Sequence, residues 1–315
     1  MGATLAVPLL AAALSGWVTQ PPTKTERTEV GAARIGAVAY IEGGFGPRGN
    51  ATLRTVERYD LRTGSTRIVA PMPIALNHAP AVAHRGAVYV IGGYAGSGHG
   101  SDAGTRGLLR YDPRRDRWSR LRPMPTSRGA LCAGAIGDRL YAVGGASNGR
   151  PLATLDIYDL ATGRWRRGPP MAKPREHLAC AVAGGMLYAL AGRASGQGNF
   201  TTVERYDPAS DRWEARADMA KARGGIGAAT AGQEIVVLGG EEGAGTIKEV
   251  EAYDPATDRW RALPDMPTPR HGLGVVAYRG RVYAIEGGTS PGFSFSRTVE
   301  ALAALRASSS NGLRA

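Results

Sequence analysis

Arginine recurs through this 315-residue chain with the spacing of a repeat, and its chemistry suggests a function. The last four copies stand 47 or 48 residues apart. The second repeat has no arginine at this position and carries Leu76 instead, between the first and the second copy. The five copies are Arg27, Arg128, Arg175, Arg223 and Arg270. A guanidinium group stays charged and offers paired planar donors, so a ring of such groups could hold a carboxylate or a phosphate. The alternative is structural, with each arginine binding loop carbonyls or a neighbouring acid.

Histidine and glutamate accompany these arginines. His78, His177 and His271 stand one or two positions beyond the arginine or beyond Leu76, with Glu29 and Glu176 beside them. A further carboxylate, Glu286, could carry protons if it lay near a ligand. The ligand-binding candidates outside the arginine set are therefore His78, His177, His271, Glu176 and Glu286. No spacing puts two of the histidines on one strand face, so the sequence predicts no metal site, and we expect no cofactor.

A repeated sheet must position these residues. Apolar segments end in a glycine pair about every 48 residues, and most copies continue with a Tyr-Asp and a tryptophan. Alternating segments such as Thr202 to Tyr206, with Asp-Pro turns after them, are typical of short antiparallel strands. Each of the six copies therefore predicts four strands, and the first of them is rich in small residues, as an innermost strand near a propeller axis would be.

The combined pattern of glycine pair, Tyr-Asp and tryptophan resembles the kelch-repeat family from Gly16 to Leu302. The resemblance implies an all-β fold: a single six-bladed β-propeller with four-stranded antiparallel blades. Thr66 departs from the pattern because it stands where the other complete repeats carry tryptophan, so we expect a weaker blade contact there.

The last repeat lacks a fourth strand, and the beginning of the chain can supply it. Residues 16–22 match residues 164–170 of the third repeat, with Trp17 in the place of Trp165. We expect this N-terminal strand to pair with the last blade and so to close the ring, which leaves no open sheet edges between the ends. The propeller is expected over residues 14–302.

The two ends of the chain carry other signals. Leu5 to Leu14 resembles the apolar core of a secretory signal with a cut after Ala13, which assigns residues 1–13 to a signal-like segment and predicts a secreted or periplasmic protein. This run is too short to span a membrane, and the cytoplasm is the alternative location. The composition of residues 303–315 predicts a disordered tail.

The two cysteines stand in neighbouring repeats. Cys132 and Cys180 fall one position apart in equivalent strands, so strand alternation should point them to opposite faces. We expect two buried thiols and no disulfide.

Charge and loop length suggest a binding function. A formal net charge of +12 favours an acidic partner, while the scattering of the basic residues and the lack of an aromatic platform argue against nucleic acid. Long Gly/Ser-rich loops such as residues 94–106 and 193–200 all fall on one face, where binding sites usually lie.

The sequence therefore predicts a monomeric, non-catalytic binding module whose basic long-loop face takes an acidic protein segment or an anionic glycan. The alternative is a propeller enzyme acting on an anionic sugar. It would be similar to the six-bladed sialic acid mutarotase among kelch relatives, with Glu286 or Glu176 as proton carrier.

Overall fold

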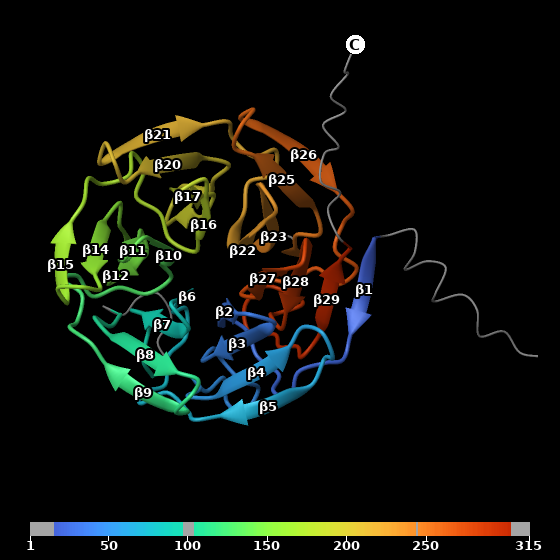
Figure 1. Ribbon diagram of the computed structural model, residues 1–315. Helices are drawn as coiled ribbons and strands as arrows, with labels where there is room; N and C mark the ends of the chain where they lie inside the picture. Colours follow the sequence, from blue (N-terminus) through green and yellow to red (C-terminus); the bar gives the residue numbers. More distant parts are fainter. Residues whose placement is uncertain (1–15, 97–103, 244, 304–315) are drawn as a thin grey trace, which may run out of the picture.

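The computed structural model describes residues 16–96, 104–243 and 245–303, and the regular structure in these ranges is all β-sheet. Six four-stranded antiparallel sheets surround a central axis as the blades of a propeller, which confirms the predicted fold class (Figure 1). Each blade starts with its innermost strand at the axis and proceeds outward. The predicted signal-like segment 1–13 and residues 304–315 of the predicted tail lie outside the described residues.

The first three blades follow the chain in order. Blade 1 consists of β2 (Gly31–Ile35), β3 (Val38–Glu42), β4 (Val56–Asp60) and β5 (Thr66–Val69). Blade 2 consists of β6 (Ala81–His84), β7 (Ala87–Ile91), β8 (Leu108–Asp112) and β9 (Arg117–Arg120). Blade 3 consists of β10 (Cys132–Ile136), β11 (Arg139–Val143), β14 (Leu155–Asp159) and β15 (Arg164–Arg167).

The other three blades include the one that joins the ends. Blade 4 consists of β16 (Ala179–Ala183), β17 (Met186–Leu190), β20 (Val203–Asp207) and β21 (Arg212–Arg216). Blade 5 consists of β22 (Gly224–Ala231), β23 (Glu234–Glu242), β25 (Val250–Asp254) and β26 (Arg259–Leu263). Blade 6 consists of β27 (Gly274–Tyr278), β28 (Arg281–Ile285), β29 (Val299–Leu302) and β1 (Trp17–Gln20).

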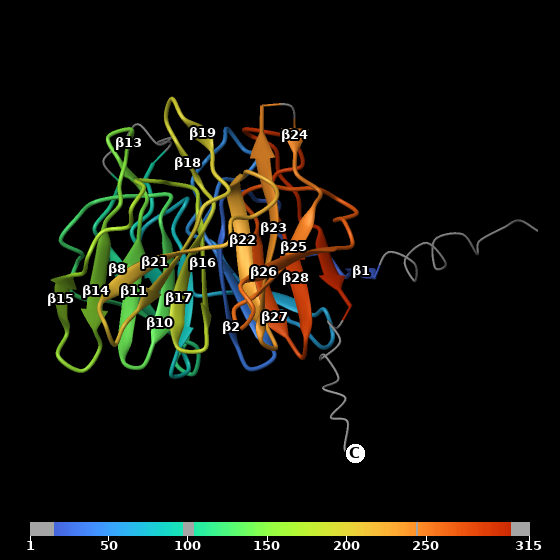
Figure 2. The same cartoon turned by 90° about the horizontal axis from the view of Figure 1, so that it is seen from above.

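Small extra strands mark the long-loop face. They are β12 (Ala146–Ser147), β13 (Arg150–Pro151), β18 (Arg193–Ala194), β19 (Gly198–Asn199) and β24 (Gly245–Thr246). Figure 2 shows β13, β18, β19 and β24 rising on one side of the ring. The described loops therefore distinguish the two faces as the loop lengths predict.

The innermost strands are made of small residues because six of them crowd around one axis. A methyl group added to Gly134 would lie 2.5 Å from Cδ1 of Leu187, and one added to Gly227 would lie 2.1 Å from Cγ2 of Val275. Both glycines let the inner strand of one blade touch the next blade, which is the close approach that a glycine in a strand often marks.

The tryptophans of the outermost strands join neighbouring blades. Each indole N–H donates to a backbone carbonyl of the preceding blade at 2.8 or 2.9 Å: Trp118 to Ala70, Trp165 to Arg122, Trp213 to Pro169, Trp260 to Ala217, and Trp17 to Pro264. Blade 1 has Thr66 in this place, and there the hydroxyl of Tyr59 donates to the carbonyl of Pro21 at 2.8 Å. Pro21 is equivalent to Pro169, whose carbonyl accepts from Trp213. In blade 1 a tyrosine therefore makes the bond that a tryptophan makes in the other blades.

The ring closes through β1, as predicted. β1 pairs antiparallel with β29, with Trp17 opposite Leu302 and Gln20 opposite Val299. Trp17 is 1% exposed, and the amide of Ala303 donates to the carbonyl of Gly16 at 2.6 Å. Blade 6 is therefore built from both ends of the described chain (Figure 1).

The expectation of two free thiols is wrong, because Cys132 and Cys180 form a disulfide between β10 and β16. Their Cα atoms are 5.3 Å apart. The two side chains do leave opposite faces of equivalent strands. In a propeller, however, one face of each blade packs against the opposite face of the next, so these directions converge across the blade interface.

Glu42 is a polar exception in the core of blade 1. The equivalent residues of the other blades are Ile91, Val143, Leu190, Leu238 and Ile285. Glu42 is 1% exposed, and neither of its carboxyl oxygens has a hydrogen-bond partner among the described residues. Burial raises its pKa to about 8, against the opposing charge of Arg27.

Replacing Glu42 by leucine should stabilise the fold, because burying an unpaired polar group costs about 1–3 kcal/mol. The pKa of Glu42 is higher in the folded protein than in the unfolded chain, so binding of its proton stabilises the fold. This stabilisation is fully present below the ordinary glutamate pKa of 4.5 and is lost as the pH rises through about 8. Urea unfolding at pH 5 and pH 8 should therefore show a gain for Glu42→Leu that is larger at pH 8. Glu42→Gln removes the titrating group but keeps a buried polar side chain, so it should only reduce the change in the free energy of unfolding between pH 5 and pH 8. An equal gain at both pH values would contradict this assignment.

No helix in the described ranges is long and apolar enough to cross a membrane.

Candidate functional site

A closed ring of backbone hydrogen bonds surrounds the mouth of the central channel on the long-loop face. One residue per blade takes part, and all six have a left-handed backbone, with φ between 50° and 72°. We call these six residues the mouth ring: Glu29, His78, Ala130, His177, Gly225 and Gly272. Each amide from His78 onward donates to the carbonyl of the preceding member at 2.8–3.1 Å, and Val30 completes the circle by donating to Gly272 at 3.2 Å.

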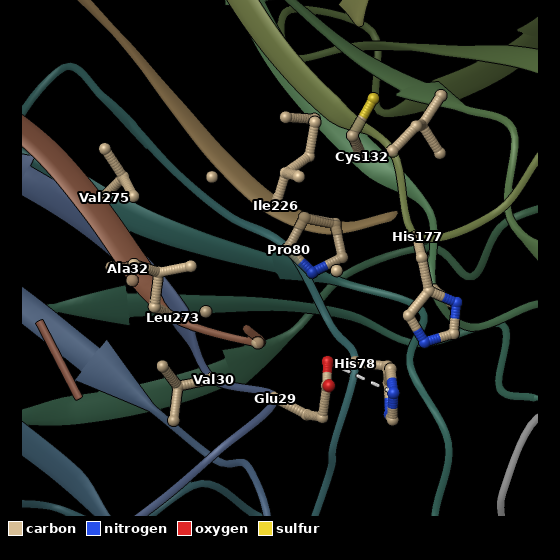
Figure 3. A pocket seen from close by; sticks show the side chains of 18 of the residues that line it. Glu29, Val30, Ala32, His78, Pro80, Cys132, His177, Ile226, Leu273 and Val275 are labelled. Carbon is tan, nitrogen blue, oxygen red and sulfur yellow. Dashed lines mark ion pairs between the residues drawn. The ribbon is translucent and has the colours of Figure 1, made fainter. Parts of the chain in front are cut away.

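Two cavities meet at this ring. The channel cavity has a volume of about 150 Å³ and is lined by the small and apolar residues of the inner strands. The mouth cavity has a volume of about 240 Å³ and opens among the long loops, where Phe45 and Phe293 form part of its wall. Glu29, His78 and His177 line both cavities, and Figure 3 shows them together at one end of the channel.

The side chains of these three residues contact one another across blades. Oε2 of Glu29 lies 3.2 Å from Nε2 of His78, and the rings of His78 and His177 are 4.8 Å apart in an edge-to-face arrangement. Nδ1 of His271 lies 3.0 Å from the other oxygen of Glu29, while Nε2 of His271 lies 3.0 Å from the carbonyl oxygen of Ser290. Because a carbonyl only accepts, Nε2 of His271 carries a proton.

Arg193 lies at the side of the mouth cavity. Its Nε contacts Glu176 at 3.1 Å, and its Nη1 contacts Glu241 at 2.8 Å. Nδ1 of His177 is 2.7 Å from the second oxygen of Glu176. Nη2 of Arg193 forms no hydrogen bond with the described residues, so it can still donate to a ligand.

The electrostatics of the cavity lower the pKa of two of its carboxyl groups, those of Glu29 and Glu176. Burial favours the neutral form of Glu176, but His177 and Arg193 dominate and lower its pKa to about 2. Neighbouring imidazoles likewise hold the pKa of Glu29 below its usual range despite burial. Burial lowers the pKa of His78 to about 4. Burial also disfavours the charged form of His271, but its hydrogen bond to Glu29 and the charges of Glu29 and Glu241 raise its pKa.

The five repeated arginines lie elsewhere. Each is 0% exposed, and none lines the mouth cavity. Arg223 is representative: it donates to the carbonyls of Gly239 and Glu249 at 3.3 and 2.8 Å and to the carboxylate of Glu251 at 2.7 Å. The acids that pair with the five are Glu57 and Glu286 with Arg27, Asp156 with Arg128, Glu204 with Arg175, Glu251 with Arg223, and Glu300 with Arg270. The five arginines therefore bind neighbouring acids and backbone carbonyls, which is the structural alternative that the sequence had left open.

Blade 2 shows how this arrangement can be replaced. Leu76 takes the arginine position, and Leu109 takes the position of the paired acid. Both leucines are buried in one apolar cluster. The arginine and its acid are absent together, as expected if each serves mainly to neutralise the other.

The structure brings four of the predicted site residues to the mouth cavity: His78, Glu176, His177 and His271. Glu286 is buried against Arg27, with 2.9 Å between Oε1 and Nη2, and does not line the cavity. The candidate set omitted Glu29, Arg193 and Glu241. Glu29 could have been included, because it precedes the second glycine of its repeat by the same 15 residues as His78 and His177.

The cavity also differs in charge from the predicted basic face. Its charged residues include three carboxylates, from Glu29, Glu176 and Glu241, and one guanidinium. Exposed arginines are common on the outermost strands instead, as in Arg164, Arg166 and Arg167 of β15.

Comparison with known proteins agrees with this architecture. Residues 30–221 match the family described as the KLHDC2/KLHL20/DRC7 Kelch-repeats domain, and residues 222–267 match the Kelch motif. Among curated proteins, human Kelch-like protein 34 is 36% identical over 113 residues, which are 36% of this chain and 17% of that protein. The Kelch-like protein terF of Aspergillus terreus is 34% identical over 124 residues, which are 38% of this chain and 27% of that protein.

The matched segment is therefore a minor part of each relative's length. The family match, by contrast, extends over more than half of the chain, and the six blades of the structure agree with it. The chain belongs to the kelch-repeat family of β-propellers.

Proposed function

We propose that this chain is a non-catalytic binding module whose long-loop face holds an acidic segment of a partner protein. Arg193 carries the proposal. Arg193 lines the mouth cavity, and Glu176 and Glu241 fix its guanidinium, while its Nη2 forms no hydrogen bond with any residue that the structure describes and can donate to a carboxylate. A preorganised guanidinium loses little freedom on binding, and a net charge of +12 on the chain attracts an anionic partner over longer distances.

An anionic glycan offers the same carboxylate chemistry and is the competing ligand class. The enzyme alternative is not proposed, since Glu286 is buried away from the cavity and no feature of Glu176 specifically favours proton transfer. We expect the module to be a monomer.

Binding of defined probes to the full chain tests this function. We expect a fluorescent peptide with a run of glutamates to bind more tightly than a matched peptide with lysines, and its affinity to fall as salt rises. Arg193→Gln should weaken the acidic peptide about tenfold or more, since a lost charged contact costs at least about 1.4 kcal/mol. Arg164→Gln, an exposed arginine on the outer strand β15, is the matched control and should have little effect.

Two results would overturn the proposal: a preference for the lysine peptide, or equal affinities for the acidic peptide before and after Arg193→Gln. Saturable binding of sialic acid without binding of the acidic peptide would instead favour the glycan class.

We further infer that the protein works in an oxidising compartment, as the signal-like segment predicts. The Cys132–Cys180 disulfide supports this location, because such bonds persist mainly in exported proteins. Recovery of the chain from the cytoplasm with both thiols reduced would count against export.

A further inference from the structure

We propose that Glu29, His78 and His177 bind a divalent transition-metal ion, with Zn²⁺ as the best chemical match, where the channel meets the mouth cavity. The site itself is independent of the proposed function. Its role, which is to accept a carboxylate of the partner, rests on that function.

The donor set is the first argument. One carboxylate oxygen and one nitrogen from each imidazole lie within 4.8 Å of one another. The three side chains are largely buried, with exposures of 12% for Glu29, 9% for His78 and 7% for His177. Two imidazoles and a carboxylate are a ligand set that zinc sites use when one coordination position stays open.

The hydrogen bonds around His78 fix which nitrogen can bind a metal. The hydroxyl of Thr52 donates to the carbonyl of Gly96, so it can only accept from the side-chain amide of Asn77, which lies 2.8 Å away. The amide oxygen of Asn77 then faces Nδ1 of His78 at 2.6 Å and requires a proton there.

A neutral His78 therefore has its lone pair on Nε2, which faces Oε2 of Glu29 at 3.2 Å. Two acceptors at this distance need a proton or a metal ion between them.

The other two ligands are held in a matching way. Nδ1 of His177 lies 2.7 Å from Oε2 of Glu176, a charge contact without the geometry of a hydrogen bond, and the imidazole offers one nitrogen to the cluster. In Figure 3 the ring of His177 points toward His78 and Glu29. The remaining oxygen of Glu29 is held by His271 at 3.0 Å. Outer contacts of this kind, of which the hydrogen bond between His78 and Asn77 is the clearest, are typical of metal-binding histidines.

Charge is the second argument. The cavity contains three carboxylates, so an acidic partner would be repelled from its floor even though Arg193 and His271 offset part of this charge. A bound dication would reverse the local balance, and its open coordination position would face the mouth cavity. The metal would thus supply the positive charge that the predicted arginine ring, being buried, does not.

Metal binding is tested on the full chain, without a histidine tag, after treatment with a chelator. Isothermal titration with Zn²⁺ should show one site per chain. His78→Ala and His177→Ala should each weaken this site by about tenfold or more, and Asn77→Ala by about 10–100-fold. His84→Ala is the control, since His84 lies beside a carboxylate, that of Asp138 at 3.4 Å, outside the cluster.

Co²⁺ gives a readout that does not depend on stability. The wild-type chain should develop the visible absorption of a low-symmetry cobalt site, and Glu29→Gln, checked for folding by circular dichroism, should lose it. The absence of one-site binding, or its persistence in the His78→Ala/His177→Ala double variant, would overturn the proposed site.

The role of the ion is tested separately with the acidic peptide. We expect chelation to weaken peptide binding and Zn²⁺ to restore it. Peptide binding that is unchanged by chelation would leave the proposed function standing and remove the metal from it. Zinc binding without peptide binding would keep the site and overturn the function.

Discussion

Replacing Arg223 by leucine is expected to lower the free energy of unfolding by about 3–5 kcal/mol, because it leaves the carboxylate of Glu251 buried without its partner. Arg223 is fully buried, and its Nη2 lies 2.7 Å from Oε2 of Glu251. Urea unfolding of the purified variant measures the loss directly.

Blade 2 predicts how to recover this loss. The double variant Arg223→Leu/Glu251→Leu reproduces the pairing of Leu76 with Leu109, so it should be markedly more stable than the single variant. The carbonyl of Gly239 would still lack its donor. In blade 2 the hydroxyl of Thr105 donates to the equivalent carbonyl of Gly92 at 2.9 Å. Ile247 takes the position of Thr105 in blade 5, so adding Ile247→Thr should supply this donor and restore more stability.

This series also tests whether the arginines belong to a ligand site. If the double variant binds the acidic peptide as wild type does, Arg223 has a structural role only. A double variant that is no more stable than Arg223→Leu would contradict the analogy with blade 2.

Removal of residues 1–20 is expected to abolish the cooperative melting transition, whereas removal of residues 1–13 should leave it unchanged. The longer deletion removes β1, and with it the buried Trp17 and four residue pairs with β29. Loss of a buried tryptophan side chain alone costs about 3–5 kcal/mol, against a typical domain stability of about 5–15 kcal/mol.

Thermal unfolding followed by circular dichroism compares the two truncations. The point variant Trp17→Ala should fall between them, because it keeps the backbone pairing but loses the packing and the bond to Pro264. Equal melting temperatures for the two truncations would show that β1 does not hold the ring together.

Sequence reasoning succeeded where the determinants are local or strictly repeated. Glycine pairs, Asp-Pro turns and the position of Trp17 predicted the blades and the closure of the ring, because strand period and turn chemistry act within a few residues. The same reasoning named His78, His177 and His271 as ligand-binding candidates, and all three line the mouth cavity.

Contacts between blades were less accessible. Cys132 and Cys180 were judged by the faces of one sheet, and so were His78 and His177. Around a propeller axis, equivalent strands turn their opposite faces toward each other, so the relevant neighbour belongs to another repeat. The arginines posed a further difficulty, since a long side chain near the mouth can turn into the blade or into the channel, and repeat spacing does not distinguish these directions.

The mouth ring separates the support of the site from its chemistry. Its closed circle uses only backbone amides and carbonyls, so the side chains of its members take no part in the hydrogen bonds of the ring. In this chain, Glu29, His78 and His177 carry polar groups, while Gly272 leaves room for Glu29, since a methyl group on Gly272 would lie 2.6 Å from the carboxyl carbon of Glu29. A frame that is held by backbone bonds alone sets the shape of the mouth without setting the side chains in it, which is why recognising the family did not name the ligand.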